Sequence, residues 1–185
     1  MDQRYALFFD IDGTLVSFKT HEIPPSTILA LTQAKANGSR VYIATGRPPI
    51  IITNLGAIEH LIDGYITTNG ALCFVGDKLV ACQPIDKDDV MTCVEDSKAK
   101  GYSLIIVGRK DVAVLDHSGD VDRIFRQMLA VKNLDKASPL DVVLQQDILQ
   151  LTPFFPADYE PELMARMPKC ISGRWHPEFT DITAN

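Results

Sequence analysis

Short apolar runs alternate with longer amphipathic stretches through the first part of the chain. Residues 5–9 (YALFF) and 40–44 (RVYIA) have the composition of strands buried on both faces, and residues 65–68 (YITT) predict a third strand. Between the first two runs, apolar positions spaced three and four apart predict a helix with Ser26 as its N-cap. A second helix is predicted at residues 48–61. This order predicts a parallel sheet with right-handed crossovers, the doubly wound (Rossmann-like) α/β class.

The pattern changes in the second part of the chain. Residues 71–75 and 78–82 flank Gly76-Asp77, which predicts a tight hairpin. Beyond it we expect helices at residues 88–99, 120–131 and 159–167, and strands at 103–107, 112–116, 148–152, 170–175 and 179–183. Hairpins with helices on one face are typical of a separate α+β domain. We therefore expect two domains, residues 1–83 and 84–185.

Charge and hydropathy narrow the choice of partner. The net charge is −6 and the pI is about 5.1, which leaves no basic field for a nucleic-acid backbone. No apolar stretch approaches the length that spans a bilayer, and the first residues lack the features of a signal peptide. We therefore expect a cytoplasmic protein with no nucleic-acid or membrane partner. A small phosphorylated ligand stays compatible, because a metal ion and a few local donors can offset weak repulsion.

The most specific motif is DIDGTL at residues 10–15, directly after the first predicted strand. Ligands of open parallel sheets bind beyond the carboxyl ends of the strands, where these acids fall. Asp10 and Asp12 are two residues apart on an extended chain, so both side chains can point to one site. Close carboxylates repel each other unless a cation holds them, and Mg²⁺ is a hard ion that prefers oxygen ligands.

Two other interpretations compete with this one. An acidic loop after a strand can be a solvated turn, although DxDGT would arise by chance in roughly one chain of this length in a thousand. The D-x-D motif of glycosyltransferases is the second rival. It does not predict the Gly13-Thr14-Leu15 that follows, nor a position near the N-terminus.

These residues carry a resemblance to a known family. Residues 8–15 (FFDIDGTL) look like motif I of phosphatases of the haloacid dehalogenase (HAD) superfamily, and residues 43–47 (IATGR) look like motif II. Residues 66–71 (ITTNGA) resemble the segment that leads into the cap of the Cof-like branch. The resemblance implies part of a HAD core in residues 1–83 and an inserted α+β cap of the C2B type in residues 84–185.

The resemblance also implies a mechanism. Asp10 would attack phosphorus and form an aspartyl-phosphate, while Asp12 would protonate the leaving alcohol and then activate water. Mg²⁺ would bind to the Asp10 carboxylate and the Asp12 backbone carbonyl. Thr45 would donate its hydroxyl to a phosphoryl oxygen, together with the Gly46 N–H. Arg47 would belong to the same phosphate-binding loop.

Several of these residues have alternative roles. Thr45 could instead cap a helix that begins near Pro48. Arg47 could fork onto a phosphate or the polar groups of a substrate, or lie as an exposed salt-bridge partner. Asn69-Gly70 could be a plain turn, or a hinge that also forms a wall of the site.

The predicted cap offers further candidates near its last two strands. Such side chains could bind a sugar or another leaving group, although isolated residues of these types more often serve packing or the surface. The candidates are Arg174, Trp175, His176, Glu178 and Asp181.

The family has two further motifs, a phosphate-neutralising Lys and an acidic GDxxxD, which normally follow the cap. Neither precedes Asn185, so we expect a chain truncated before motifs III and IV. Lys169 lies inside the cap pattern, and the acidic residues 118–122 suit a turn and helix start better than a metal site. We expect the missing charges to make these 185 residues inactive or weakly active.

The leading hypothesis is a Mg²⁺-dependent phosphatase, a phosphoric monoester hydrolase. Its substrates would be small phosphorylated metabolites, with sugar phosphates as the preferred class, and the full-length protein would be a monomer. One alternative is a non-catalytic module that keeps the phosphate pocket. Another is a phosphomutase-like phosphotransferase, in which the intermediate passes to a sugar instead of water.

Overall fold

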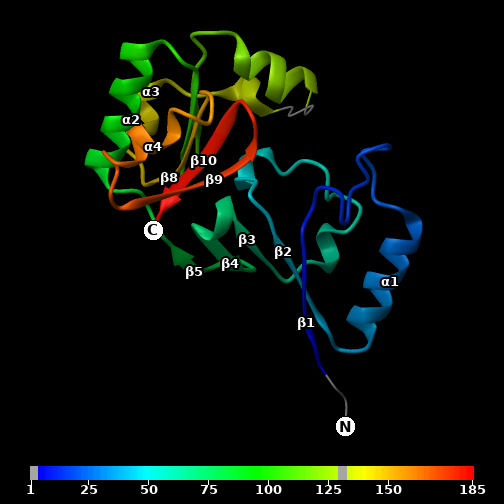
Figure 1. The fold of residues 1–185 in the computed structure, drawn as a ribbon. Helices are drawn as coiled ribbons and strands as arrows, with labels where there is room; N and C mark the ends of the chain where they lie inside the picture. Colours follow the sequence, from blue (N-terminus) through cyan, green and yellow to red (C-terminus); the bar gives the residue numbers. More distant parts are fainter. Residues whose placement is uncertain (1–3, 129–132) are drawn as a thin grey trace. The chain divides into compact units, whose positions relative to one another are not determined.

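A computed structural model describes residues 4–128 and 133–185 (Figure 1). The chain divides into two compact units, Met1–Cys82 and Gln83–Asn185. Each unit is built on one five-stranded sheet. Among the described residues, every helix is too short or too polar to cross a bilayer. The assignment of the second unit as a C2B-type cap stays a prediction.

The sheet of the first unit is mixed, in the order β1-β2-β3-β4-β5. Its strands are β1 (Ala6–Phe9), β2 (Arg40–Ala44), β3 (Gly64–Thr67), β4 (Leu72–Val75) and β5 (Lys78–Cys82). The first three strands are parallel, and the last two form an antiparallel hairpin around Gly76-Asp77. The α/β class, the parallel strands and the hairpin are therefore confirmed.

Helix α1 (Pro25–Ala36) connects β1 to β2 and buries Leu31. Its N-cap is Pro24, not Ser26 as predicted, and no side chain caps it. A proline suits the first helical position, because the N–H that it lacks would be unpaired there. Leu31 packs in one cluster with Val41 and Ile43 of β2, so α1 covers that face of the sheet.

The prediction of a helix at residues 48–61 is wrong. The segment contains only two single 3₁₀ turns, Pro49–Ile51 and Glu59–Leu61. The three consecutive β-branched isoleucines at 50–52 are poor helix formers, and Gly56 lies in the middle of the predicted helix. Buried apolar residues, among them Leu55 and Ile58, still fix the segment against the core.

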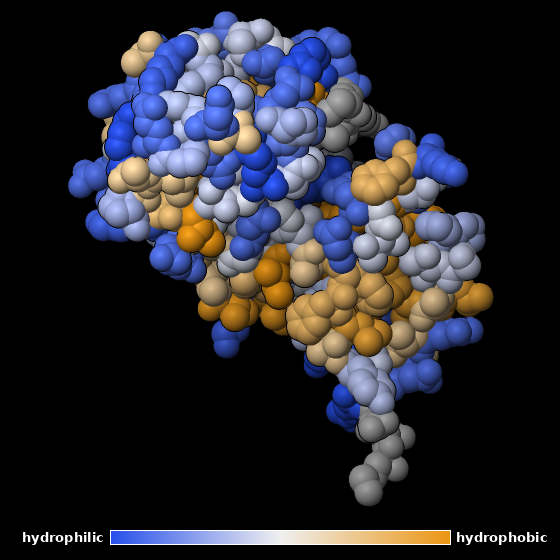
Figure 2. Space-filling model, in the orientation of Figure 1, coloured by the Kyte–Doolittle hydropathy of each residue, from blue (hydrophilic) through white to orange (hydrophobic). Residues whose placement is uncertain are grey.

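The composition of β1 predicted burial on both faces, and this prediction is wrong. Phe8 is 55% exposed and stacks on Tyr42 of β2, with ring centroids 5.0 Å apart. Only the other face, which carries Phe9, packs against the core of the unit. Figure 2 shows apolar side chains gathered over the surface of this unit.

The sheet of the second unit is antiparallel in every pairing, in the order β7-β6-β8-β10-β9. Its strands are β6 (Leu104–Gly108), β7 (Val112–Leu115), β8 (Ile148–Pro153), β9 (Cys170–His176) and β10 (Phe179–Ala184). Its helices are α2 (Lys87–Lys100), α3 (Leu140–Val143) and α4 (Glu160–Met164). All three helices place apolar residues in one core with Leu104, Ile106 and Ile182.

The helix predicted at residues 120–131 is a π-helical segment, Asp122–Met128, followed later by a 3₁₀ turn at Asn133–Lys136. Residues 129–131 of the prediction lie outside the described part of the chain.

A buried carboxylate ties α2 to α4. Asp96 accepts hydrogen bonds from the Tyr102 hydroxyl at 2.9 Å, the Tyr159 hydroxyl at 2.7 Å and Arg166 Nη1 at 2.7 Å. Burial alone would raise the pKa of Asp96, but these donors outweigh it and hold the pKa below its ordinary value. The network fixes how the helices pack on this sheet.

Candidate active site

The loop after β1 presents the two predicted catalytic acids. Ile11 is buried, and its carbonyl accepts the N–H groups of Leu15 at 3.1 Å and Val16 at 2.9 Å. Because these apolar residues hold the loop in the core, Asp10 is left exposed and Asp12 partly exposed at the carboxyl end of the strand. This is the edge at which an open parallel sheet binds ligands.

Gly13 makes this tight loop possible. Its φ is +78°, and a Cβ at this position would lie 2.4 Å from Cε2 of Phe18. A side chain would therefore be both strained and in collision. The glycine of the motif is required by the backbone, while the exposed Phe18 ring would have to move aside for any side chain here.

The loop after β2 carries the predicted phosphate-binding residues. Thr45 is buried, and its N–H donates to the Ile66 carbonyl of β3 at 2.9 Å. Its hydroxyl oxygen accepts the Arg47 N–H at 3.2 Å, which leaves the hydroxyl proton available for donation. Thr45 is not the N-cap of a longer helix, because only one 3₁₀ turn follows it and Pro48 is the N-cap of that turn.

Arg47 binds Asp12 through two parallel hydrogen bonds. Its Nε lies 2.7 Å from Oδ2 and its Nη2 lies 2.9 Å from Oδ1, the strong bidentate geometry of guanidinium and carboxylate. Nη1 also donates to the Ile51 carbonyl at 3.3 Å. The arginine is thus a salt-bridge partner of the predicted acid/base, as one alternative from the sequence had it, but it is partly buried and not exposed. The two residues are 35 positions apart, so no local pattern indicates the pair.

The segment after β3 closes against the same loop. Thr68 and Asn69 have φ of 54° and 53°, a left-handed conformation that is uncommon outside glycine. The Thr68 N–H donates to the Arg47 carbonyl at 3.2 Å, and a Cβ on Gly46 would lie 2.8 Å from Asn69 Oδ1. Of the two alternatives for Asn69-Gly70, the structure thus disfavours a plain turn: the turn is strained and lies beside the predicted phosphate-binding loop.

The donors for a metal ion at this edge are few but of the right kind. Carboxylate and carbonyl oxygens suit Mg²⁺, which usually keeps several waters and binds to one or two protein carboxylates. Asp10 and the Asp12 carbonyl offer such oxygens. Within residues 4–128 and 133–185, no cluster of three or more metal-binding side chains is present. In the segment 118–122, Asp120 forms an ion pair with Arg123 and Asp122 forms one with Arg126. These acids therefore serve the start of a helix, as the sequence predicted.

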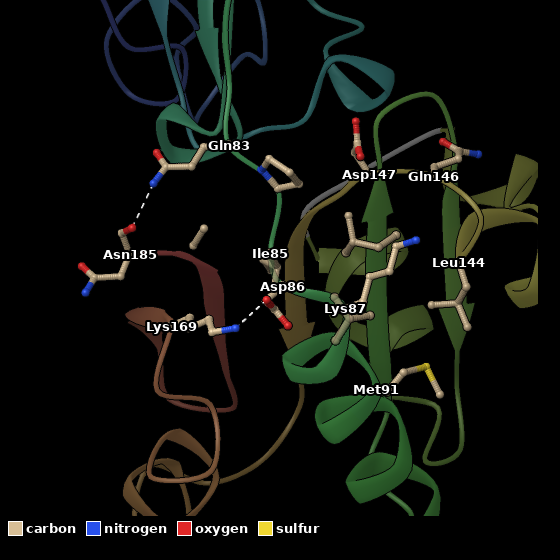
Figure 3. Close-up of a pocket in the computed structure, with 14 residues that line it drawn as sticks. Gln83, Ile85, Asp86, Lys87, Met91, Leu144, Gln146, Asp147, Lys169 and Asn185 are labelled. Atoms are coloured by element: carbon tan, nitrogen blue, oxygen red, sulfur yellow. Dashed lines mark hydrogen bonds and ion pairs between the residues drawn. The ribbon is translucent and has the colours of Figure 1, made fainter.

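A separate cavity of about 580 Å³ lies in the second unit (Figure 3). Lys169 lines it and is paired with Asp86, with Nζ 2.6 Å from Oδ2. This hydrogen bond raises the pKa of Lys169 and lowers the pKa of Asp86. None of the predicted site residues lines the cavity.

Comparison with known proteins agrees with this geometry. A family model described as haloacid dehalogenase-like hydrolase matches residues 7–185. YkrA of Bacillus subtilis (strain 168), a provisionally named phosphatase, is 24% identical over 180 residues, which cover 95% of this chain and 66% of YkrA. The chain thus spans slightly under two thirds of that relative.

Two solved structures are more similar in sequence. The HAD subclass IIB sugar phosphatase BT4131 is 42% identical with a TM-score of 0.87, over 98% of this chain and 70% of that chain. A structure from work on a trigonal-bipyramidal intermediate in a phosphoryl-transfer superfamily is 42% identical with a TM-score of 0.88. That match covers 97% of this chain and 69% of the other.

Proposed function

The chain belongs to the haloacid dehalogenase-like hydrolases. We propose that it is part of a Mg²⁺-dependent phosphatase that acts on small phosphorylated metabolites. The resemblance to the haloacid dehalogenase superfamily is confirmed, and the similarity to a subclass IIB phosphatase supports the Cof-like branch. The observation that carries the proposal is Asp10 and Asp12 at the end of β1, with Arg47 forked onto Asp12. The similarity to a sugar phosphatase supports sugar phosphates as the substrate class.

In the proposed reaction, an Asp10 oxygen attacks phosphorus as the bond from phosphorus to the ester oxygen breaks. Asp12, protonated on an oxygen released from Arg47, donates its proton to the leaving alkoxide, so an alcohol departs and an aspartyl-phosphate remains. Asp12 then accepts a proton from water, which attacks the same phosphorus and releases inorganic phosphate. Asp10 returns to its starting carboxylate.

The neighbouring loops would bind and orient. Thr45 has a hydroxyl proton to donate to a phosphoryl oxygen, and the Gly46 N–H would join it. We assign Arg47 a positioning role, because its two bonds fix the plane of the Asp12 carboxylate. Mg²⁺, held by the Asp10 carboxylate and the Asp12 carbonyl, would supply charge shielding for the phosphate.

The test is Mg²⁺-dependent phosphate release by the full-length protein from p-nitrophenyl phosphate and a panel of sugar phosphates. We expect Asp10→Asn to lower the rate at least about a thousand-fold, because an amide is a far weaker nucleophile. Asp77→Asn removes the same charge from an exposed hairpin turn and should leave the rate unchanged. The proposal fails if no ester is hydrolysed faster by the wild type than by Asp10→Asn. A requirement for a sugar bisphosphate would favour a mutase instead.

A further inference from the structure

Three rings near the β9–β10 turn form what we call the aromatic ledge: Trp175, His176 and Phe179. Trp175 is the single tryptophan of the chain, and it is 60% exposed. It meets Phe179 edge to face, with centroids 4.7 Å apart and planes at 89°. His176 stacks on Phe179 at 4.7 Å and 14°. Buried Phe179 thus supports both of the other rings.

The exposed indole is anchored from below. Its Nε1–H donates to Oδ2 of Asp181 at 2.9 Å, and Asp181 is only 7% exposed. The other oxygen of Asp181 accepts from Gln150 Nε2 and Thr152 Oγ1, both at 2.8 Å. The indole N–H of an exposed tryptophan can bond to water, so a buried carboxylate is not required to satisfy it. Here the polar edge of the ring is fixed while most of its surface faces solvent.

The turn beneath the ledge is also held in place. Arg174 is largely buried, and its Nη1 donates to the carbonyls of His176 at 3.3 Å and Pro177 at 3.0 Å. Its Nε binds Glu160 at 2.5 Å. Rigid aromatic side chains give contact area at little cost in conformational entropy, which is why binding surfaces use them.

Polar groups border the rings. The Glu178 N–H donates to His176 Nδ1 at 3.2 Å, so the proton of the neutral imidazole lies on Nε2 as a donor. The Glu178 carboxylate forms two hydrogen bonds with Arg123, which lower its pKa and keep it charged. The border therefore offers both donors and acceptors beside an apolar surface.

We propose that the aromatic ledge binds a sugar ring. The C–H face of the sugar would stack on the indole, while its hydroxyl groups would bond to His176 and the Glu178–Arg123 pair. The choice of a sugar over another flat or cyclic ligand rests on the proposed function. A nucleic-acid strand is disfavoured by the net charge of −6.

The single tryptophan makes the test direct. Its fluorescence, excited selectively over tyrosine, is followed while methyl glucoside, a glucose monophosphate, adenosine or inorganic phosphate is added to the full chain. We expect a saturable blue shift with both sugars, half-complete on the order of 1 mM as is usual for weak binding. Inorganic phosphate and adenosine should leave the emission unchanged.

Variants localise the response. His176→Ala should weaken sugar binding about three-fold or more, whereas Ile171→Ala, which alters a half-exposed residue of the same strand, should not. Trp175→Ala should abolish saturation transfer from the protein to the sugar protons in NMR, with retained circular dichroism as the folding check. An absent sugar response, a response to adenosine alone, or an unaltered response in His176→Ala would overturn the inference.

The outcome is separable from that of the phosphatase proposal. Asp10→Asn should keep the full fluorescence response while it loses phosphate release. A sugar response in this chain, together with no turnover by the full-length protein, would support the ledge and reject the phosphatase. Turnover without any sugar response would do the reverse.

Discussion

Gly46 and Asn69 approach each other so closely that no methyl group fits between them. The ideal Cβ position on Gly46 is 2.8 Å from Asn69 Oδ1, and Asn69 is itself held at a φ of 53°. Neighbouring Thr45 and Arg47 are tied to the end of β3 by hydrogen bonds with Ile66 and Thr68. At the residue scale, the predicted phosphate-binding loop is therefore in close contact with a strained turn through the Asn69 side chain.

Gly46→Ala should destabilise the fold by about 1 kcal/mol, because the added methyl group must displace the Asn69 side-chain amide. Chemical unfolding in urea measures the change. Gly56→Ala is the matched control, since a Cβ there meets no atom within 4 Å. The control should be neutral or stabilise by up to about 1 kcal/mol. Equal effects of the two substitutions would contradict a close approach at Gly46.

At the scale of elements, Asp63 joins α1 to the sheet of the first unit. Its carboxylate accepts Lys35 Nζ of α1 at 2.6 Å and the Val41 N–H of β2 at 2.8 Å. Burial by itself raises the pKa of Asp63. The hydrogen bonds from Lys35 and Val41 and the charges of Lys35 and Arg40 outweigh burial, so the pKa lies below its ordinary value of 3.8. One carboxylate thus connects the last turn of α1 to the start of β2.

Asp63→Asn should lower the free energy of unfolding at neutral pH by about 1–3 kcal/mol, the range for hydrogen bonds to a charged group. Because the folded pKa is depressed, this stability is present above 3.8 and is lost as the pH falls through the folded pKa. The difference between wild type and variant should therefore shrink in acid. Urea unfolding over a pH series measures it, with exposed Asp77→Asn as the control. A pH-independent difference would rule out the ionic contribution.

At the scale of the whole molecule, the outer edge of β1 pairs with no described strand. Phe8 of this strand and Tyr5, which directly precedes it, are more than half exposed. Unpaired strand edges with apolar side chains are sites of self-association. The expectation of a monomer for the full-length protein stays a prediction.

We expect the 185-residue chain to associate as its concentration rises, and Phe8→Lys to reduce that association. Size-exclusion chromatography with light scattering measures the mass. Leu29→Lys adds the same charge at a similarly exposed position of α1, away from the strand edge, and should leave association unchanged. Association that responds equally to both variants would point to net charge instead of the β1 edge.

The sequence alone determined the features that depend on neighbouring residues. Alternation of apolar runs and helical stretches predicted the parallel order of β1, β2 and β3, and a Gly-Asp pair predicted the β4–β5 hairpin. The motif after β1 placed Asp10 and Asp12 at the carboxyl edge of the sheet. Such signals are carried by periodicity, turns and short motifs, which a single sequence displays.

Only the tertiary structure decided which side chains meet. The pairing of Arg47 with Asp12, and the anchoring of Trp175 on Asp181, depend on how separate elements pack. Packing also exposed Phe8 on a strand whose composition predicted burial, and reduced the segment at 48–61 to two short turns. A polar side chain can choose among many partners along the chain. The choice follows from the space and burial that the assembled elements leave, which no local pattern records.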